Sequence, residues 1–261
     1  MTEALRTLLA GLIDYAGLFP PASLEMAEAQ GNYVSYAAGD YAWALGRFVV
    51  PSARLDEVDP TWKCSVIGLP TRVVDACEIK VERASDLPAL LQNVMPGVIA
   101  YYEMPITEDP APLAGTTGRA KVRTGGLTSD AFPPAAALAG FIARCAAAKV
   151  PFKATAGLHH PLRSVQRCAY AADSPTALMH GFVNVFLAAA SLWQGGSEAD
   201  AAATLEEQSA SAFAWGDAAV TWHGQRLTLE QLRAAREQLA ISFGSCSFEE
   251  PVRDLQQLGW L

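Results

Sequence analysis

Short apolar segments rich in β-branched and aromatic residues recur along the chain, and helical patterns separate several of them. Most of these segments end at Gly or Pro, and they are 47–51, 64–70, 75–81, 97–105, 119–126, 150–157 and 240–246. Such endings are typical of strands that enter loops. The clearest helical pattern between them is PAAALAGFIARCAAA, in which Leu138, Phe141, Ile142 and Cys145 recur at helical spacing. Strands that alternate with helices predict β–α units and a parallel sheet.

The number of these segments favours a closed (β/α)8 barrel of the TIM type, in the α/β class. Seven strands are visible, and 180–188 is either an eighth strand or the middle of a helix. The length of 261 residues suits one such barrel. The link between 64–70 and 75–81 is too short for a helix, so we expect an irregular second β–α unit. The stretch 218–228 predicts a small inserted hairpin.

The N-terminal part of the chain reads as helical. Apolar residues between Leu5 and Ile13 lie on one stripe, two prolines end that pattern, and a second helical stretch covers about 23–45. We therefore expect a helical extension over 1–46, packed on a barrel formed by 47–261, in a single domain overall. The segment around the double proline, 13–21, is expected to plug the bottom of the barrel, with a lid over the barrel as the alternative.

The composition argues against several classes of function. The net charge is −8 and no long basic run is present, so nucleic acid is not an expected partner. The chain has five cysteines, an odd number, and no two of them have CxxC spacing. This indicates free thiols in a reducing compartment. The N-terminus does not read as a signal peptide, and the apolar run FVNVFLAAASLW is too short to span a bilayer. We therefore expect a cytoplasmic protein without a membrane partner.

Polar side chains gather near the carboxyl ends of four successive predicted strands. Because side chains alternate between the two faces of a strand, residues two apart share a face. The pairs that share a face are Glu78 with Lys80, Tyr101 with Glu103, Lys121 with Arg123, and Lys153 with Thr155. In a barrel this face is the interior, and active sites lie at its C-terminal mouth. Buried cations without partners are costly, so we expect the two glutamates and an anionic ligand to offset them.

The segment PFKATAGLHHP, residues 151–161, fits such a mouth. It places Lys153 in mid-strand, Gly157 where the backbone can turn close to a ligand, and His159 and His160 just past the strand end. A lysine beside other cations has a lowered pKa and can form a Schiff base with a carbonyl. Lys121 lies one β–α repeat before Lys153, so we expect one of them to be the nucleophile and the other to depress its pKa.

Three short motifs resemble the last three strands of class I aldolases of the deoxyribose-phosphate aldolase type. They are KVRTGG at 121–126, KATAG at 153–157 and GSCS at 244–247. In that family one strand carries the Schiff-base lysine in a Lys-x-x-Thr-Gly motif, and the next strand carries a second lysine followed by glycines. The last strand ends in a Gly-x-Ser-Ser phosphate loop.

The resemblance implies a (β/α)8 barrel and roles for single residues. It implies that Lys121 is the Schiff-base lysine, that Lys153 is the second lysine, and that Gly244 and Ser247 belong to a phosphate loop. Thr124, Gly125 and Gly157 match the remaining motif positions, whereas Arg123 stands where the family has a small residue.

We therefore predict an enzyme, a lyase of the aldolase type or an isomerase, that acts on a small phosphorylated or carboxylated carbonyl compound without a cofactor. The candidate catalytic residues are Lys153, Lys121, Glu103, His159 and His160, with the glutamate as general acid or base and a histidine as rim acid. The candidate anion-binding residues are Arg123, Thr124, Gly125, Gly126, Gly244, Ser245 and Ser247, with the arginine as a fork. Further candidates are Glu78, Lys80 and Asn184.

Two alternatives remain open at this stage, as does a homo-oligomeric state. In the first, His159 and His160 with Glu103, and His180 or His223, bind a divalent metal ion. Adjacent histidines on an extended chain point in opposite directions, which opposes this interpretation. In the second, the protein binds an anionic small molecule without catalysis. Lys121, Arg123, the 244–247 backbone and the helix expected to begin near Ser247 would then hold the anion.

Overall fold

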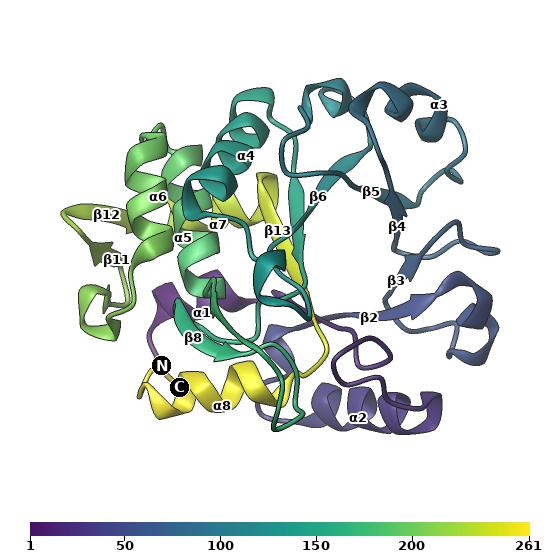
Figure 1. The fold of residues 1–261 in the computed structure, drawn as a ribbon, viewed down its shortest axis with the longest axis horizontal. Coiled ribbons are helices and arrows are strands. Elements are labelled where there is room, and N and C mark those ends of the chain that lie inside the picture. Colours follow the sequence, from purple (N-terminus) through teal and green to yellow (C-terminus); the bar gives the residue numbers. More distant parts are fainter.

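The computed structural model describes residues 1–261 and contains a closed barrel of parallel strands (Figure 1). Around the barrel the strands are β1 (Ile13–Tyr15), β2 (Leu45–Pro51), β3 (Cys64–Ile67), β4 (Ala76–Lys80), β5 (Ile99–Glu103), β6 (Arg119–Arg123), β7 (Phe152–Thr155) and β13 (Ala240–Ser245). The last of these strands pairs with β1 and closes the ring. The predicted (β/α)8 TIM-type barrel is therefore confirmed.

The helices cover the barrel unevenly. They are α1 (Glu3–Leu9), α2 (Met26–Ala38), α3 (Leu87–Leu91), α4 (Ala135–Ala148), α5 (Phe182–Trp193), α6 (Glu198–Glu206), α7 (Leu229–Gln238) and α8 (Glu249–Gln257). Figure 1 shows α4 to α7 grouped on one side, whereas no helix stands between β3 and β4. The irregular second unit follows from its short connection, as the sequence predicts.

Local sequence accounts for the start of α7. The side chain of Thr228 accepts a hydrogen bond from the backbone N–H of Gln231, and the Gln231 side chain accepts one from the backbone N–H of Thr228. This reciprocal arrangement is a capping box and satisfies donors that the first helical turn leaves free. The predicted insertion also forms, as a hairpin of β11 (Ala219–Trp222) and β12 (Gln225–Thr228) next to the short β10 (Ala214–Trp215).

One expectation about the barrel's strands is wrong, and one open choice is decided. Residues 13–15 are not part of a helical extension over 1–46, because they form β1 and occupy the eighth place in the barrel. Of the two alternatives for 180–188, the helix is correct, because α5 begins at Phe182. A strand of three residues is too short to show a period, and a continuous apolar run fits a buried helix as well as a buried strand.

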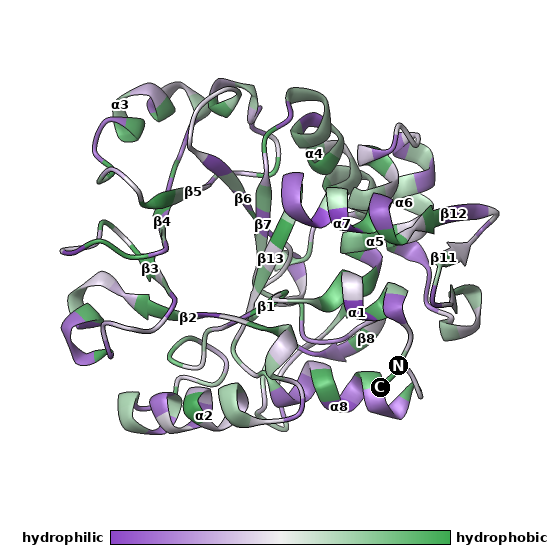
Figure 2. Ribbon diagram, turned by 180° about the vertical axis from the view of Figure 1, so that it is seen from behind, coloured by the Kyte–Doolittle hydropathy of each residue, from purple (hydrophilic) through white to green (hydrophobic).

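One stretch, Ser129–Ala148, passes a length and composition test for a membrane span, although one such helix is weak evidence. It contains α4, which packs against α5 and α6, and its Leu138, Phe141 and Ile142 side chains are fully buried in the protein. In Figure 2, α4 is mainly hydrophobic, whereas α8 alternates between hydrophobic and hydrophilic residues. Burial between the barrel and other helices thus accounts for the composition of α4.

A second hairpin, which the sequence did not predict, lies between β7 and α5. Its strands are β8 (Ser164–Arg167) and β9 (Thr176–Met179). Val165 and Leu178 are cross-strand partners on its exposed face, while Met179 and Ala177 are buried on the other face with Cys168. This hairpin therefore presents an apolar surface towards the rest of the protein.

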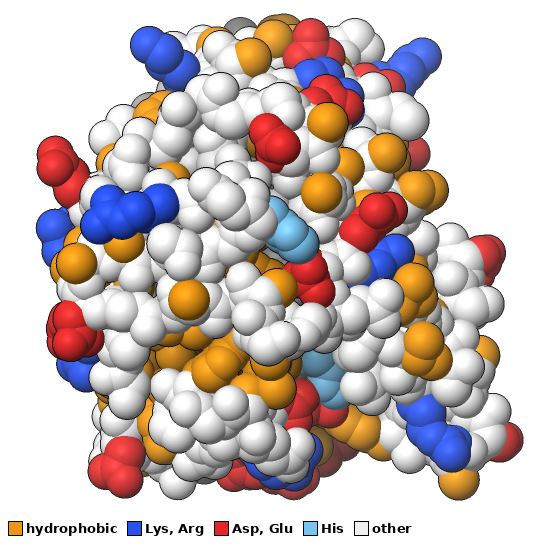
Figure 3. Space-filling view, turned by 90° about the vertical axis from the view of Figure 1, so that its left-hand side faces the viewer, with side chains coloured by type: hydrophobic (Ala, Val, Ile, Leu, Met, Phe, Trp, Pro, Cys, Tyr) orange, Lys and Arg blue, Asp and Glu red, His pale blue; other side chains and the backbone are white.

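The face of the molecule shown in Figure 3 carries acidic and basic side chains that are interspersed rather than gathered into one basic patch. Hydrophobic side chains are visible in the lower central part of that view. A mixed surface of this kind gives no electrostatic stripe for a polyanion on that face.

Candidate active site

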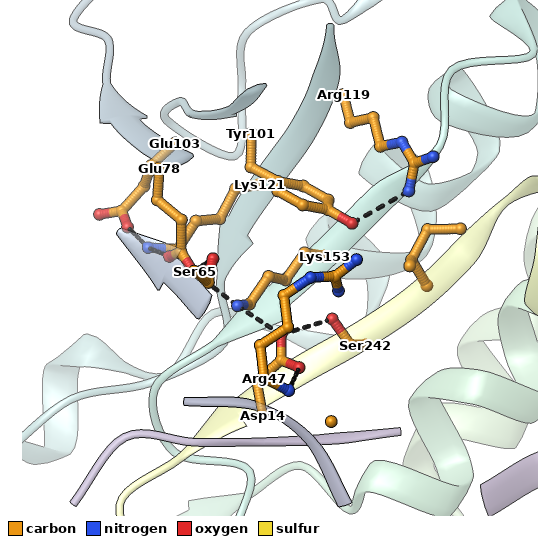
Figure 4. A network of polar contacts seen from close by, with 12 residues as sticks. Asp14, Arg47, Ser65, Glu78, Tyr101, Glu103, Arg119, Lys121, Lys153 and Ser242 are labelled. Atoms are coloured by element: carbon orange, nitrogen blue, oxygen red, sulfur yellow. Dashed lines mark hydrogen bonds and ion pairs between the residues drawn. The ribbon is translucent and has the colours of Figure 1, made fainter. Parts of the chain in front are cut away.

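Charged side chains from five barrel strands meet in the barrel interior, and Figure 4 labels all of them except Arg123. They alternate in sign and run from the interior towards solvent. We call this set the charge chain, and in order its members are Asp14, Lys153, Glu78, Lys121, Glu103 and Arg123. Three acids face three bases, so the formal charge of the set is 3 − 3 = 0. Arg47 beside Asp14 adds a further positive charge outside this set, so the expected anionic ligand stays a prediction.

Strand register explains how the outer members meet. Glu103 on β5 is the register partner of Lys121 on β6, and Lys121 is the register partner of Lys153 on β7. Register partners on neighbouring strands lie about 4.8 Å apart and send their side chains to the same face. The polar alternation that the sequence shows thus becomes a row of charged groups at one level of the barrel.

The side chain of Lys153 is almost fully buried inside the barrel. Its Nζ lies 2.7 Å from Asp14 Oδ2 and 2.5 Å from Glu78 Oε1, and the side chain is 1% exposed. Burial alone would lower the pKa of Lys153, but attraction to Asp14 and Glu78 outweighs it and raises the pKa above its usual value. Lys153 is therefore an ammonium ion at neutral pH and has no lone pair for nucleophilic attack.

Glu78 joins the two lysines. Its Oε1 faces Lys153 and also accepts a hydrogen bond of 2.6 Å from Ser65 Oγ, while its Oε2 lies 2.6 Å from Lys121 Nζ. Burial would raise the pKa of Glu78, but Lys153 and Lys121 outweigh it and hold the pKa well below the usual range. Glu78 is thus a permanent carboxylate that fixes both ammonium groups.

The outer half of the charge chain is progressively more open. Lys121 Nζ lies 2.6 Å from Glu103 Oε2, and Arg123 lies 3.5 Å from Glu103 Oε1. The exposed fraction of the side chains rises from 6% at Lys121 to 15% at Glu103 and 55% at Arg123. A ligand that enters from solvent therefore meets Arg123 first, then Glu103 and Lys121.

Asp14 is the member of the site that sequence reasoning missed. Its Oδ2 accepts hydrogen bonds from Lys153 Nζ and, at 2.9 Å, from Ser242 Oγ, and its Oδ1 accepts one of 2.7 Å from the backbone N–H of Arg47. A Cβ at position 46 would collide with Asp14 Oδ1, so Gly46 makes room for this carboxylate. The only signal in the sequence is an acid within an otherwise apolar run.

A cavity of about 390 Å³ lies beside the charge chain. Lys121, Glu103 and Arg123 line one side of it, together with the inner residues Glu78 and Lys153. The other lining side chains are mainly apolar, and they come from Phe19, Pro20, Pro21, Val49, Ile67, Leu127 and Met179. The cavity therefore combines charged residues, which we call the ionic floor, with these apolar residues, which we call the apolar wall.

The position of the double-proline segment corrects an expectation. Residues 13–21 do not plug the bottom of the barrel, because Ala16, Phe19, Pro20 and Pro21 line the cavity at its mouth. The reason is that β1 runs parallel to the other strands, so the residues that follow it emerge at the C-terminal mouth. They border the cavity without filling it.

The two adjacent histidines contact different carboxylates. His159 lines the cavity, and its Nδ1 lies 3.5 Å from Glu250 Oε2. Burial, and next the charge of His160, lower the pKa of His159 to about 4, so it is neutral at pH 7 and not a ready acid. His160 instead points to α8, with its Nδ1 2.6 Å from Asp254 Oδ2. The predicted rim acid is therefore not supported by the state of His159.

The loop 244–247 offers backbone N–H groups to an anion, but no free serine hydroxyl. The Ser245 hydroxyl donates to the Ser247 carbonyl oxygen at 2.6 Å, and the Ser247 hydroxyl accepts a hydrogen bond from the backbone N–H of Glu250. The first turn of α8 carries Glu249 and Glu250, whose charges oppose an anion there. Gly244 lines the cavity, but the two serines do not.

The residues after Lys121 mainly hold the loops together. The Thr124 hydroxyl donates to the carbonyl oxygen of Ala156 at 2.6 Å. Gly157 has a positive φ of 73°, and a Cβ there would approach Gly125 Cα to 2.9 Å. Gly125 and Gly157 permit close packing of two loops. Gly126 and Gly157 border the cavity, whereas Gly125 does not.

Two further candidates lie apart from the ionic floor. Lys80 borders the cavity but its side chain is 75% exposed and pairs with Glu82 at 3.2 Å. Asn184 lies in α5, away from the cavity, where its side-chain N–H₂ donates to the carbonyl oxygens of Thr204 and Glu207. Asn184 is therefore a structural residue, and its candidacy is corrected.

The side chains do not fit the metal alternative. His180 Nε2 lies 2.8 Å from the Pro133 carbonyl oxygen, and His223 Nε2 lies 2.7 Å from Glu207 Oε2. Glu103 faces Lys121 rather than the histidine pair. No group of three or more His, Cys, Asp or Glu side chains stands in a geometry that could hold a metal ion.

Comparison of the chain with family models, with curated proteins and with solved structures finds no match. The resemblance to class I aldolases stays a prediction, although its three motifs do lie on β6, β7 and β13. Function is therefore inferred from the geometry of the charge chain and its cavity.

Proposed function

We propose that this protein is an enzyme that forms a Schiff base between Lys121 and the carbonyl group of a small anionic substrate, as a lyase or an isomerase. The observation that carries the proposal is the place of Lys121 at the edge of the cavity, 2.6 Å from Glu103. The TIM-barrel fold supports the general class, because active sites of this fold lie at the C-terminal mouth.

The geometry favours Lys121 over Lys153 as the nucleophile. Lys153 is enclosed by two carboxylates that are themselves almost fully buried, and its raised pKa keeps it charged. Lys121 shares Glu78 with it, but its second partner, Glu103, is partly exposed and reaches the cavity. Glu103 is thus a partly exposed base that can take the proton of Lys121 and meet the substrate, whereas the partners of Lys153 are almost fully buried.

The proton and electron balance of the proposed step can be written with these groups. Lys121 passes a proton to Glu103, and the lone pair of the amine then forms the N–C bond with the carbonyl carbon. Glu103 returns that proton to the carbonyl oxygen, takes a second proton from nitrogen and delivers it to the hydroxyl group, which leaves as water. The resulting iminium ion carries the same charge as the original ammonium, so Glu78 keeps a cationic partner throughout.

Arg123 would bind the anionic group of the substrate. Its guanidinium is about half exposed and has a long contact of 3.5 Å to Glu103, so part of its donor fork is free. A guanidinium can bind a carboxylate with two parallel hydrogen bonds, which would orient the carbonyl towards Lys121 on the same strand face.

A cytoplasmic location is proposed because all five cysteines are free thiols, as is typical of proteins in a reducing compartment.

Reductive trapping tests the Schiff base directly. The protein is incubated with a panel of small carboxylated and phosphorylated aldehydes and ketones, treated with borohydride, and analysed by intact-mass and peptide mass spectrometry. The expected result is one adduct, located on Lys121. The matched control is Lys121→Arg, which keeps a cation between Glu78 and Glu103 but cannot form the imine. An adduct on another lysine, or none with any panel member, contradicts the proposal.

The short contact between Lys121 and Glu103 also favours a second candidate, proton transfer without a covalent intermediate. Such an enzyme would exchange protons next to the substrate carbonyl by general acid–base catalysis. It would show exchange of substrate protons in deuterated water and no trapped adduct. A pure binding protein would show neither result.

A further inference from the structure

We propose that the substrate of this cavity is a carboxylate-bearing carbonyl compound with an apolar body about the size of an aromatic ring, and not a phosphorylated sugar. This inference rests on the proposed function, because it concerns the same cavity. It goes further by assigning the chemistry of each part of the substrate to a part of the wall.

The first observation is the shortage of neutral hydrogen-bonding groups around the cavity. Among its lining residues, Thr155 alone carries a hydroxyl group, His159 alone carries an imidazole, and none carries a side-chain amide. The charged groups on the floor are largely occupied by one another. A sugar with several hydroxyl groups would leave them without partners, and unpaired polar groups in a buried site weaken binding.

The second observation is the set of apolar residues that line the same cavity as the charge chain. Phe19, Pro20 and Pro21 come from the loop after β1, and Met179 comes from the buried face of the β8–β9 hairpin. These residues lie far apart in the sequence and converge on one cavity. A wall of this kind gains affinity from apolar surface that a ligand removes from water.

The third observation concerns the number of cations available for an anion. Arg123 is the cavity-lining cation whose only carboxylate contact is a long one, at 3.5 Å, while Lys80 extends into solvent beside Glu82. The loop 244–247 uses its serine hydroxyls internally and precedes two glutamates, so it offers an anion only backbone N–H groups. One exposed guanidinium suits a carboxylate, whereas a phosphate dianion is typically held by several donors.

The fourth observation is the size of the cavity. Its volume of about 390 Å³ is well above the ~150 Å³ of a cavity that holds a benzene molecule. A three-carbon compound would therefore leave much of the apolar wall in contact with water. An aromatic or branched aliphatic body fills that space, with the carbonyl at Lys121 and the carboxylate at Arg123.

Isothermal titration calorimetry with defined probes tests the inference on the full chain. The probes are phenylpyruvate, pyruvate, glyceraldehyde 3-phosphate and inorganic phosphate. Phenylpyruvate is expected to bind at least about tenfold more tightly than pyruvate, because its ring is buried against the wall. It is also expected to bind more tightly than either phosphorus-containing probe. Equal or tighter binding of glyceraldehyde 3-phosphate or phosphate overturns the inference, as does no binding of phenylpyruvate.

Two variants assign the parts of the ligand. Arg123→Gln is expected to weaken phenylpyruvate binding about tenfold and to leave phenylacetone, which lacks the carboxylate, unchanged. Met179→Ser is expected to weaken phenylpyruvate more than pyruvate. If Arg123→Gln weakens both aromatic probes equally, or if Met179→Ser affects both keto acids equally, the assignment is wrong.

The same titrations on Lys121→Arg separate this inference from the proposed Schiff base. Retained preference for phenylpyruvate in that variant supports the substrate class even where borohydride traps no adduct in the native protein. An adduct of Lys121 with glyceraldehyde 3-phosphate, without one from phenylpyruvate, supports the Schiff base and overturns the substrate class.

Discussion

The inner and outer halves of the charge chain use the same chemistry in different surroundings. The inner half, Asp14, Lys153 and Glu78, is at most 2% exposed, and each carboxylate has additional hydrogen-bond donors. The outer half, Lys121, Glu103 and Arg123, becomes more exposed at every step. Buried pairs are held together because separating them leaves an uncompensated charge, whereas exposed pairs exchange partners at little cost. The inner half thus positions Lys121, and the outer half is free to react.

The largest expected effect is on reactivity in the outer half. Replacement Glu103→Gln removes the base beside Lys121 and is expected to slow adduct formation by about 10²-fold to 10⁴-fold. The measurement is the rate constant of borohydride-trapped labelling with the panel compound that labels the native protein. Because Lys121 keeps Glu78, the free energy of unfolding is expected to change by only about 1 kcal/mol. An unchanged labelling rate would remove Glu103 from the mechanism.

The inner half is expected to show the opposite behaviour, a loss of stability. Replacement Lys153→Met leaves two buried carboxylates without their shared cation and is expected to lower the free energy of unfolding by about 3–5 kcal/mol. Urea denaturation followed by circular dichroism measures it. The control is Lys80→Met, an exposed lysine for which we expect a change within about 0.5 kcal/mol. Similar losses in both variants would contradict the distinction between the two halves.

The pH dependence of stability follows from the same inner pair. The pKa of Glu78 is lower in the folded protein than its ordinary value of 4.5, so its contribution is present at neutral pH. That contribution is lost as the pH falls below about 5 and on towards the folded pKa. The pKa of Lys153 is raised above 10.5, so its contribution is present below that pH and is lost only in more alkaline solution.

Urea denaturation between pH 3 and pH 7 checks the acidic limb. The native protein is expected to lose stability steadily as the pH falls, and Glu78→Gln to show a shallower slope from a lower starting value. Equal slopes in the two proteins would mean that Glu78 does not have its lowered pKa.

A smaller loss of stability is expected when a substitution reduces the space around the Asp14 carboxylate. Replacement Gly46→Ala places a methyl group against Asp14 Oδ1 and is expected to cost about 1–3 kcal/mol. The control is Gly31→Ala in α2, where a Cβ meets no atom within 4 Å and alanine has the higher helix propensity. Thermal denaturation compares the stability of the two variants. If Gly46→Ala is as stable as the native protein, Asp14 can move without a loss of stability.

The amino-acid sequence by itself determined the barrel strands from β2 onwards and the faces of four of them. Glu78, Glu103, Lys121 and Lys153 could be placed on one barrel face because side-chain alternation is a local property with a period of two residues. The capping box of α7 and the 218–228 hairpin were predictable for the same reason, since each depends on residues close together in the chain.

Only the tertiary structure decided which charges meet and what covers them. Asp14 and Lys153 are 139 positions apart, and they pair because β1 closes the ring beside β13. The same closure places Phe19 and Pro21 at the mouth of the barrel instead of at its bottom. The charged strand ends therefore border a cavity whose surface is mainly apolar. Ring closure joins residues through the register of distant strands, and no local period in the chain encodes that register.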